Sequence, residues 1–310
     1  MKKTILKLSA LLLIASITIT SCKEDDDKKS DNPTPTAKNI VELAQGDTTL
    51  SILVTALSKA GLVSTLQSAG TFTVFAPTNA AFRAEKITSE SINAISSPAA
   101  IAELKNLLLY HVLGSKVLST QLTNTYVPTL YTVGGNGVSL QINVAPVKFN
   151  NSASVVTADI NASNGVIHKI GKLLFIPTVA DIAANNSEFT TLVAALTKAE
   201  LVDVVDTTNN ITVFAPINKA FSDISFDLAA TSKSALAPIL TAHVLGTAVR
   251  SSAITNGLDP TTLNPAVKLT FNTTSGVKFS GGKTTDISVT TADIQAENGV
   301  VHVINKVILP

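Results

Sequence analysis

The sequence predicts an α+β protein built from two tandem copies of one domain. A decapeptide occurs twice, as TVFAPTNAAF at 73–82 and as TVFAPINKAF at 212–221. All four histidines lie at repeat-equivalent positions, and each copy changes from helical to strand-like periodicity along its length. A repeat of about 135 residues is far too long for a solenoid. Each copy is therefore expected to bury a core of its own.

In each copy the decapeptide predicts a strand that turns into a helix. Its β-prone run ends at a proline, whose fixed φ and missing N–H stop a strand. The asparagine two residues later is suited to capping a helix that carries the second phenylalanine. A ligand site is the alternative, but beyond threonine hydroxyls the decapeptide of copy one holds no nucleophile, acid or base. The expected core anchors and turn residues are Phe75, Pro77, Asn79 and Phe82 in copy one and Phe214, Pro216, Asn218 and Phe221 in copy two.

The first half of each copy has helical periodicity. In copy one, Leu50, Leu53, Val54 and Leu57 form an i, i+3, i+4, i+7 stripe, and the same pattern returns 139 residues later. A further helix is predicted over 99–110, with Ser97 as N-cap and Pro98 in the first turn.

The second half of each copy has strand-like texture. Copy one shows a hairpin around the turn at 134–137 and a second around Asn164-Gly165. Helices that precede strands, with one strand set among the helices, predict helices packed against an antiparallel sheet or sandwich. The expected strands cover 129–133, 138–144, 154–160 and 166–170 in copy one, and 267–271, 277–279, 287–293 and 300–304 in copy two.

Residues 1–21 are predicted to be a lipoprotein signal peptide. A basic start precedes an apolar run at 8–19 that is too short to span a bilayer. The single cysteine, Cys22, follows Ile19-Thr20-Ser21, which resembles the lipobox of bacterial lipoproteins, where cleavage leaves a lipid-modified cysteine. The alternative is a free cysteine behind an ordinary cleavage site, an unusual feature in a secreted protein.

Residues 22–38 are predicted to form a disordered tether. They are charged and then Pro/Thr-rich, and they show no apolar periodicity. The acidic cluster directly after the cysteine resembles the surface-export signal of Bacteroidetes-type lipoproteins, which favours the outer face of an outer membrane. A plain linker is the alternative.

Composition excludes several classes of function. The 310 residues are 45% hydrophobic and 15% charged, enough for about two domains. Without the leader, 20 basic residues stand against 22 acidic ones, a balance that argues against a nucleic-acid partner. A lone cysteine excludes an intrachain disulfide framework and a thiolate metal cluster.

The histidines form two pairs, His111 with His243 and His168 with His302. A functional interpretation would have each pair bind a metal or move a proton. We favour a structural one, in which each histidine lies among apolar neighbours and bonds a buried backbone group. No cysteine or nearby acid completes a ligand set, so neither a metal nor a cofactor is expected.

The sequence carries no recognisable catalytic motif for a hydrolase, a nucleotide-binding enzyme or a redox enzyme. Asp159 and Asp293 occupy matching TADI segments, each before a closing hairpin. Because they belong to different copies, a paired-carboxylate site is not expected, and turn or backbone bonding is the favoured role.

Three motifs, in order and twice, resemble the fasciclin I (FAS1) domain family. They are the decapeptide, the Tyr110-His111 pair and Asn164 to Ile170, within segments 39–177 and 178–310. The resemblance implies small β-sandwich wedges flanked by helices, which serve as adhesion modules in extracellular and surface-anchored proteins. Copy two departs from the pattern, with Ala242 in place of Tyr110 and Glu200 in place of Gly61.

These observations predict a lipid-anchored surface protein for adhesion or recognition, without catalysis. Its partner would be an extracellular protein or a polysaccharide, and the resemblance implies binding contacts from Tyr110, His111 and His243. Capture of a glycan or another solute for an uptake system is the alternative. An enzyme using Asp159 or His111 is a further one, and the lack of a matched nucleophile, base and orienting residue argues against it.

Overall fold

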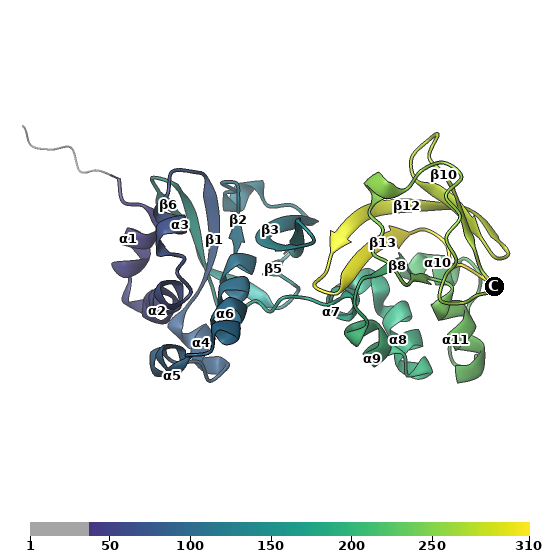
Figure 1. Ribbon diagram of the computed structural model, residues 1–310, viewed down its shortest axis with the longest axis horizontal. Coiled ribbons are helices and arrows are strands. Elements are labelled where there is room, and N and C mark those ends of the chain that lie inside the picture. Colours follow the sequence, from purple (N-terminus) through teal and green to yellow (C-terminus); the bar gives the residue numbers. More distant parts are fainter. Residues whose placement is uncertain (1–36) are drawn as a thin grey trace, which may run out of the picture. The chain divides into compact units, whose positions relative to one another are not determined.

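The computed structural model describes residues 37–310, which form one compact unit. The predicted signal peptide, Cys22 and the tether as far as Thr36 lie outside the described residues. Within the unit, each of the two copies is a curled sheet with helices packed on it (Figure 1). The predicted α+β class is confirmed.

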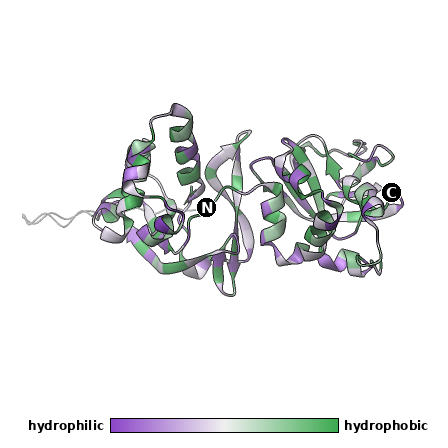
Figure 2. Ribbon diagram, turned by 90° about the horizontal axis from the view of Figure 1, so that it is seen from below, coloured by the Kyte–Doolittle hydropathy of each residue, from purple (hydrophilic) through white to green (hydrophobic). Residues whose placement is uncertain are grey.

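In copy one the helices begin where the sequence indicates. Of the predicted stripe, Leu50, Leu53 and Leu57 are buried and Val54 packs against the same core, with Leu50 in the 3-10 turn just before α2. Helix α6 starts at Pro98 behind Ser97. Hydrophobic and hydrophilic residues share the helices (Figure 2), as expected of helices with one face on a core. The helices are α1 (Ile40–Gln45), α2 (Ser51–Lys59), α3 (Val63–Gln67), α4 (Asn79–Ala84), α5 (Ser89–Ala94) and α6 (Pro98–Tyr110), with 3-10 turns η1 (Thr48–Leu50) and η2 (Ser119–Gln121).

The sheet of copy one has seven strands in the order β2-β1-β7-β6-β5-β4-β3. Both predicted hairpins are present, and the strands run longer than their apolar patterns. One feature corrects the expectation of an antiparallel sheet, because β1 pairs with β7 in parallel. The chain leaves β1 through helices and comes back as the last strand, a crossover that permits this direction. The strands are β1 (Phe72–Pro77), β2 (Val112–Leu113), β3 (Thr125–Val133), β4 (Asn136–Val144), β5 (Val147–Phe149), β6 (Ala153–Ala162) and β7 (Gly165–Ile170).

Strand β1 contributes side chains to two hydrophobic cores, one on each face of the sheet. Successive side chains of a strand point to opposite faces, and Val74 and Ala76 therefore join the cluster under the helices, together with Phe82. Phe75 faces the other way and joins Phe149 in the cluster inside the curled sheet, their ring centroids 4.2 Å apart. The predicted anchors are thus both buried, one in each core.

Copy two repeats this plan with six strands in the order β10-β11-β12-β13-β8-β9. Its parallel pair, β13 with β8, matches β7 with β1. The edge hairpin is reduced, because no counterpart of β3 is present among the described strands. The elements are α7 (Val179–Asn185), η3 (Ser187–Phe189), α8 (Thr190–Ala199), α9 (Val202–Thr207), β8 (Ile211–Pro216), α10 (Asn218–Ser222), α11 (Lys233–Thr241), β9 (Val244–Leu245), η4 (Ser251–Ala253), β10 (Leu269–Asn272), β11 (Lys278–Gly281), β12 (Thr284–Gln295) and β13 (Gly299–Ile304).

The motif asparagines cap a different helix from the predicted one. Thr78, not Asn79, caps α4 through its side chain. Asn79 instead reaches the start of α2, where its Oδ1 accepts a hydrogen bond from the Ile52 N–H at 2.9 Å. Asn218 does the same for α8, accepting from the Thr191 N–H at 2.9 Å. The decapeptide therefore joins two helices that lie apart in the sequence.

The positions of Tyr110 and Ala242 are filled in two different ways. Both residues are fully buried inside the curled sheet. In copy one, Tyr110 shares this core with Ile142, which pairs with Phe149 of β5. In copy two, Phe271 takes the register position of Ile142 and pairs with Phe279 of β11. A larger strand residue thus accompanies the smaller helix residue and keeps the core filled.

Between residues 37 and 310, no helix is long and apolar enough to cross a membrane.

Candidate binding site

The residues predicted to bind a partner lie inside the fold. Tyr110, His111 and His243 are at most 2% exposed. The Tyr110 hydroxyl donates to the Ser139 carbonyl at 3.0 Å and accepts from the Asn150 side-chain amide at 2.8 Å. Burial raises the pKa of Tyr110. Direct contact with a partner would require the domain to open, so we place these residues in the scaffold rather than on the binding surface.

His111 and His243 fasten the end of a helix to the last segment of each copy. The Nδ1–H of His111 donates to the Leu107 carbonyl at 2.7 Å, and its Nε2 accepts from the Leu174 N–H at 3.0 Å. His243 makes the same pair of bonds, to the Ile239 carbonyl at 2.8 Å and from the Ile308 N–H at 2.9 Å. Because Nε2 must accept, both rings are neutral. Burial lowers the pKa of each to about 4.

His168 and His302 use their ring nitrogens the other way round. The Nε2–H of His168 donates to the Val117 carbonyl at 2.9 Å, and its Nδ1 accepts from the Asp159 N–H at 3.2 Å. His302 bonds the Val249 carbonyl and the Asp293 N–H in the same manner. All four histidines therefore bond buried backbone groups, as the structural interpretation predicts.

Asp159 and Asp293 belong to a matching serine contact in each copy. The Asp159 carboxylate accepts from the hydroxyl of Ser119, and this bond holds its pKa below the usual range. The Asp293 carboxylate accepts in the same way from the Ser251 hydroxyl at 2.5 Å. In a catalytic triad the serine bonds the histidine, which in turn bonds the acid. Here the serine bonds the acid directly, an arrangement that holds η2 and η4 on the sheet.

Across residues 37–310 there is no group of three or more His, Cys, Asp or Glu side chains placed to hold a metal ion.

The two copies touch through the β3–β4 hairpin. The Tyr126 hydroxyl accepts a hydrogen bond from the Asn186 side-chain amide at 3.0 Å, and the Tyr126 ring packs against the core of copy two. The Gln295 N–H donates to the Ser139 hydroxyl at 3.0 Å in a buried setting. Burial raises the pKa of Tyr126 to about 12. These contacts bring polar loops of the two copies together.

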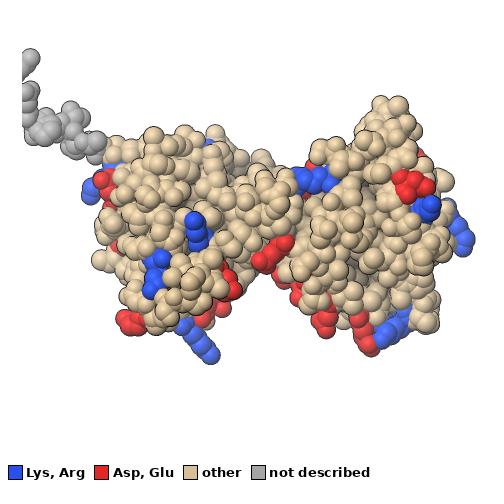
Figure 3. Space-filling model, in the orientation of Figure 1, with Lys and Arg blue, Asp and Glu red and all other residues tan. Residues whose placement is uncertain are grey.

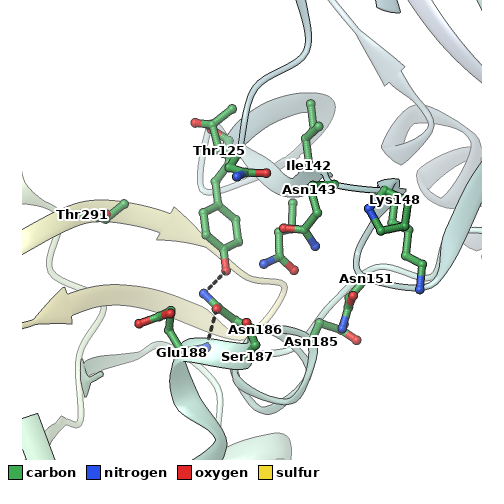
Figure 4. Close-up of a pocket in the computed structure, with 15 residues that line it drawn as sticks. Thr125, Ile142, Asn143, Lys148, Asn151, Asn185, Asn186, Ser187, Glu188 and Thr291 are labelled. Atoms are coloured by element: carbon green, nitrogen blue, oxygen red, sulfur yellow. Dashed lines mark hydrogen bonds between the residues drawn. The ribbon is translucent and has the colours of Figure 1, made fainter. Parts of the chain in front are cut away.

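A pocket of about 510 Å³ lies where these loops meet (Figure 4). Copy one supplies residues from the start of β3, from β4, and from β5 and the turns on either side of it. Copy two supplies the end of α7, η3 and one residue of β12. The lining is rich in amide side chains and includes one lysine and one glutamate. Its residues are Asn124, Thr125, Tyr126, Gln141, Ile142, Asn143, Ala145, Pro146, Lys148, Asn151, Asn185, Asn186, Ser187, Glu188 and Thr291.

Sequence reasoning did not single out this site. Four of its six amide residues lie in two Asn-rich stretches, 143–151 and 185–186, that are far apart along the chain, and the other two are Asn124 and Gln141. Such stretches ordinarily indicate turns, and the backbone at Asn150 and Asn151 is indeed left-handed. The only sequence signal was that both stretches fall outside the repeated motifs.

Comparisons with known proteins agree with the duplicated fold. The family model of the fasciclin domain matches residues 48–177 and 187–310. Protein sll1483 of Synechocystis is 38% identical over 144 residues, 46% of this chain and 77% of that protein. Transforming growth factor-beta-induced protein ig-h3 of Sus scrofa is 30% identical over 255 residues, 79% of this chain and 35% of that protein. Human periostin is 26% identical over 79% of this chain and 29% of its own length.

The chain thus spans about a third of the length of the two animal relatives. Among solved structures it is similar to a FAS1 domain pair from the insect cell adhesion molecule fasciclin I, with 17% identity and a TM-score of 0.48, over 84% of this chain and 96% of that one. The family match covers both copies and most of the described residues. This chain belongs to the fasciclin domain family, of which it carries two tandem domains.

Proposed function

We propose that this chain is a lipid-anchored adhesion or recognition protein of the bacterial cell surface. The observation that carries the proposal is the pair of complete fasciclin domains, a type of module found in cell adhesion proteins. The leader at 1–21, Cys22 and the acidic stretch that follows it support export and lipid attachment. The partner would be an extracellular protein or a polysaccharide.

We also propose that the domains do not catalyse a reaction. The repeated histidines are neutral and occupied by backbone bonds on both ring nitrogens. The repeated acids bond serine hydroxyls beside η2 and η4. In a triad-type catalytic site the nucleophile bonds a base and that base bonds an orienting group. The geometry of these residues supports a scaffold role.

Replacement of the lipid-attachment residue tests the anchoring. In Cys22→Ala the thiol that would carry the lipid is absent, so we expect the protein to move from the membrane fraction to the soluble fraction. Immunoblots of the separated fractions measure the distribution, and Ser21→Ala, which keeps the cysteine, is the matched control. Retention of Cys22→Ala on membranes would contradict the anchor.

Protease treatment of intact cells tests the orientation. We expect added protease to cleave the domains on intact cells, because the proposal places them outside the outer membrane. A periplasmic protein of the same cells serves as the control and should resist cleavage until lysis. Cleavage of the domains only after lysis would contradict the surface location.

A second candidate function is capture of a glycan or another solute for an uptake system. The polar pocket between the domains favours it, because its volume of about 510 Å³ falls in the range of small-molecule sites, ~300–1,000 Å³. Co-purification of a small ligand with the protein would support this candidate over adhesion to another protein.

A further inference from the structure

The pocket lining holds amide groups that the fold itself does not use. Within the described chain, no hydrogen bond is made by the side chains of Asn143, Asn151 or Asn185. By contrast, Asn124 and Asn186 are engaged, since Asn124 accepts from the Val144 N–H at 2.8 Å and Asn186 donates to Tyr126. The free amides come from both copies and surround one opening (Figure 4).

Gln141 provides the second observation. It lines the pocket and is only 8% exposed, and its Oε1 is the one buried side-chain polar atom without a hydrogen-bond partner in residues 37–310. A buried acceptor that lacks a donor costs free energy, and native proteins satisfy nearly all such groups. Because this oxygen is closed off from solvent, a ligand in the pocket reaches it only when the Gln141 side chain turns toward the opening, where a hydroxyl or N–H donor would satisfy it.

The chemistry of the lining selects a neutral ligand. One lysine, Lys148, and one glutamate, Glu188, are the charged residues of the pocket, so their charges cancel. On the face shown in Figure 3, charged side chains stand singly or in small groups between broad neutral areas. Each amide offers both a donor and an acceptor, and a sugar hydroxyl offers the same two functions. Pro146, which is exposed, adds apolar surface for the C–H face of a ring.

We propose that this pocket binds a neutral oligosaccharide, with Asn143, Asn151 and Gln141 of copy one and Asn185 of copy two as its hydrogen-bonding groups. The inference deepens the proposed recognition function by naming a site and a class of ligand, and it rests on that function only for its biological setting. Both domains contribute, so neither copy alone would present the whole site.

The purified full chain is titrated with a panel of neutral trisaccharides of glucose, mannose, galactose and N-acetylglucosamine, and binding is measured by calorimetry. Sialyllactose and a glucosamine trimer serve as charged probes, and an extended neutral peptide tests a protein-like ligand. We expect binding of at least one neutral trisaccharide and weaker binding of the charged probes.

The variants remove free amides without touching the scaffold. Asn143→Ala and Asn185→Ala are each expected to weaken binding about tenfold, the loss of roughly one hydrogen bond. Asn151→Gly removes the third amide, and glycine is chosen over alanine because it adopts the left-handed backbone of this residue, with φ of 51°, without strain. Asn93→Ala, at an exposed position of α5 outside the pocket, is the matched control and should bind like the parent.

Three results would overturn the proposal: no binding of any neutral trisaccharide, preferential binding of the peptide or a charged probe, or unchanged affinity in the folded Asn143 and Asn185 variants. Circular dichroism of each variant shows that it is folded. The assay uses purified protein, so it can fail while the surface anchoring holds, and it can succeed for a protein that proves to be periplasmic.

Discussion

At the scale of single residues, Gly61 and Glu200 occupy the same left-handed corner after the second α-helix of each copy, α2 and α8, with φ of 68° and 57°. Glycine adopts this conformation freely, whereas a residue with a Cβ is strained there by about 1 kcal/mol. Glu200 forms an ion pair with Lys233, but both side chains are largely exposed, and such pairs contribute little. Copy two therefore carries local strain that copy one avoids.

We expect Glu200→Gly to raise the free energy of unfolding by about 0.5–1 kcal/mol. The reverse change, Gly61→Ala, should lower it by a similar amount, since a Cβ at Gly61 meets no atom within 4 Å and adds only backbone strain. Denaturant unfolding followed by circular dichroism measures both. If Glu200→Gly instead lowers the free energy of unfolding, the ion pair with Lys233 stabilises the fold by more than the left-handed backbone of Glu200 costs.

The buried histidines make stability depend on pH. In the unfolded chain a histidine has a pKa near 6.5, whereas burial lowers the pKa of His111 and His243 to about 4. Between these values the unfolded state binds protons that the folded state does not, so the free energy of unfolding falls as the pH decreases from about 6.5 to about 4. The full loss is about 3 kcal/mol for each of the two residues.

Unfolding at stepwise pH between 7 and about 5, above the range in which most carboxylates titrate, measures the part of this loss that falls above pH 5. His111→Gln, which cannot be protonated, should be less stable at neutral pH and show a shallower decline with acid. An equal slope in the parent and the variant would contradict the assignment. His302 adds in the same direction, because burial also lowers its pKa.

At the scale of elements, one asparagine in each copy joins the helices to the closing strand. Asn164 is 6% exposed. Its Oδ1 accepts a hydrogen bond from the Ile40 N–H at the start of α1 at 3.0 Å. Its Nδ2 donates to the Leu66 carbonyl at 2.7 Å and to the Ser68 carbonyl at 3.1 Å, both at the end of α3. Asn298 plays the same part in copy two, between α7 and α9. The Asn-Gly pair is thus more than a turn signal.

Asn164→Ala leaves buried backbone groups at two helix ends without partners. We expect it to lower the free energy of unfolding by about 2–4 kcal/mol. Thermal and denaturant unfolding measure the loss, and the exposed Asn93→Ala should behave like the parent. Equal stability of the two variants would show that water replaces the Asn164 bonds.

At the scale of the whole molecule, Tyr126 links the stability of one domain to the other. It stands on β3 of copy one, yet its ring packs on the core of copy two and its hydroxyl bonds Asn186. Tyr126→Ala should therefore destabilise copy two by about 2 kcal/mol, less than a fully buried aromatic residue would cost. Hydrogen exchange of amides in β8 and β13 measures this at a distance from the substitution.

Tyr126→Phe separates the ring from the hydroxyl. It removes one hydrogen bond and keeps the packing, so we expect only about 1 kcal/mol or less. If exchange in copy two is unaffected by Tyr126→Ala, the two domains are energetically independent and the contact adds nothing to stability.

The sequence by itself determined the duplication, the order of helices and strands, and the core anchors Phe75 and Phe82. These follow from local periodicity and from residues such as Pro77 whose backbone limits are intrinsic. The order of strands and the parallel pairing of β1 with β7 were decided only in the tertiary structure, because they depend on how a distant strand returns. The same holds for Asn79, which is the first residue of the helix it was expected to cap but whose side chain bonds the start of another helix.

The candidate site belongs almost wholly to the tertiary structure. His111 and His243 repeat because both domains need them in order to fold, and Tyr110 is buried in the core of copy one, where copy two has Ala242. The pocket instead uses Asn143 and Asn185, which lie outside the three repeated motifs and meet only when two different domains touch. A sequence pattern indicates features that are local or repeated. This pocket is formed once, by different loops of two domains, and so no local or repeated pattern predicts it.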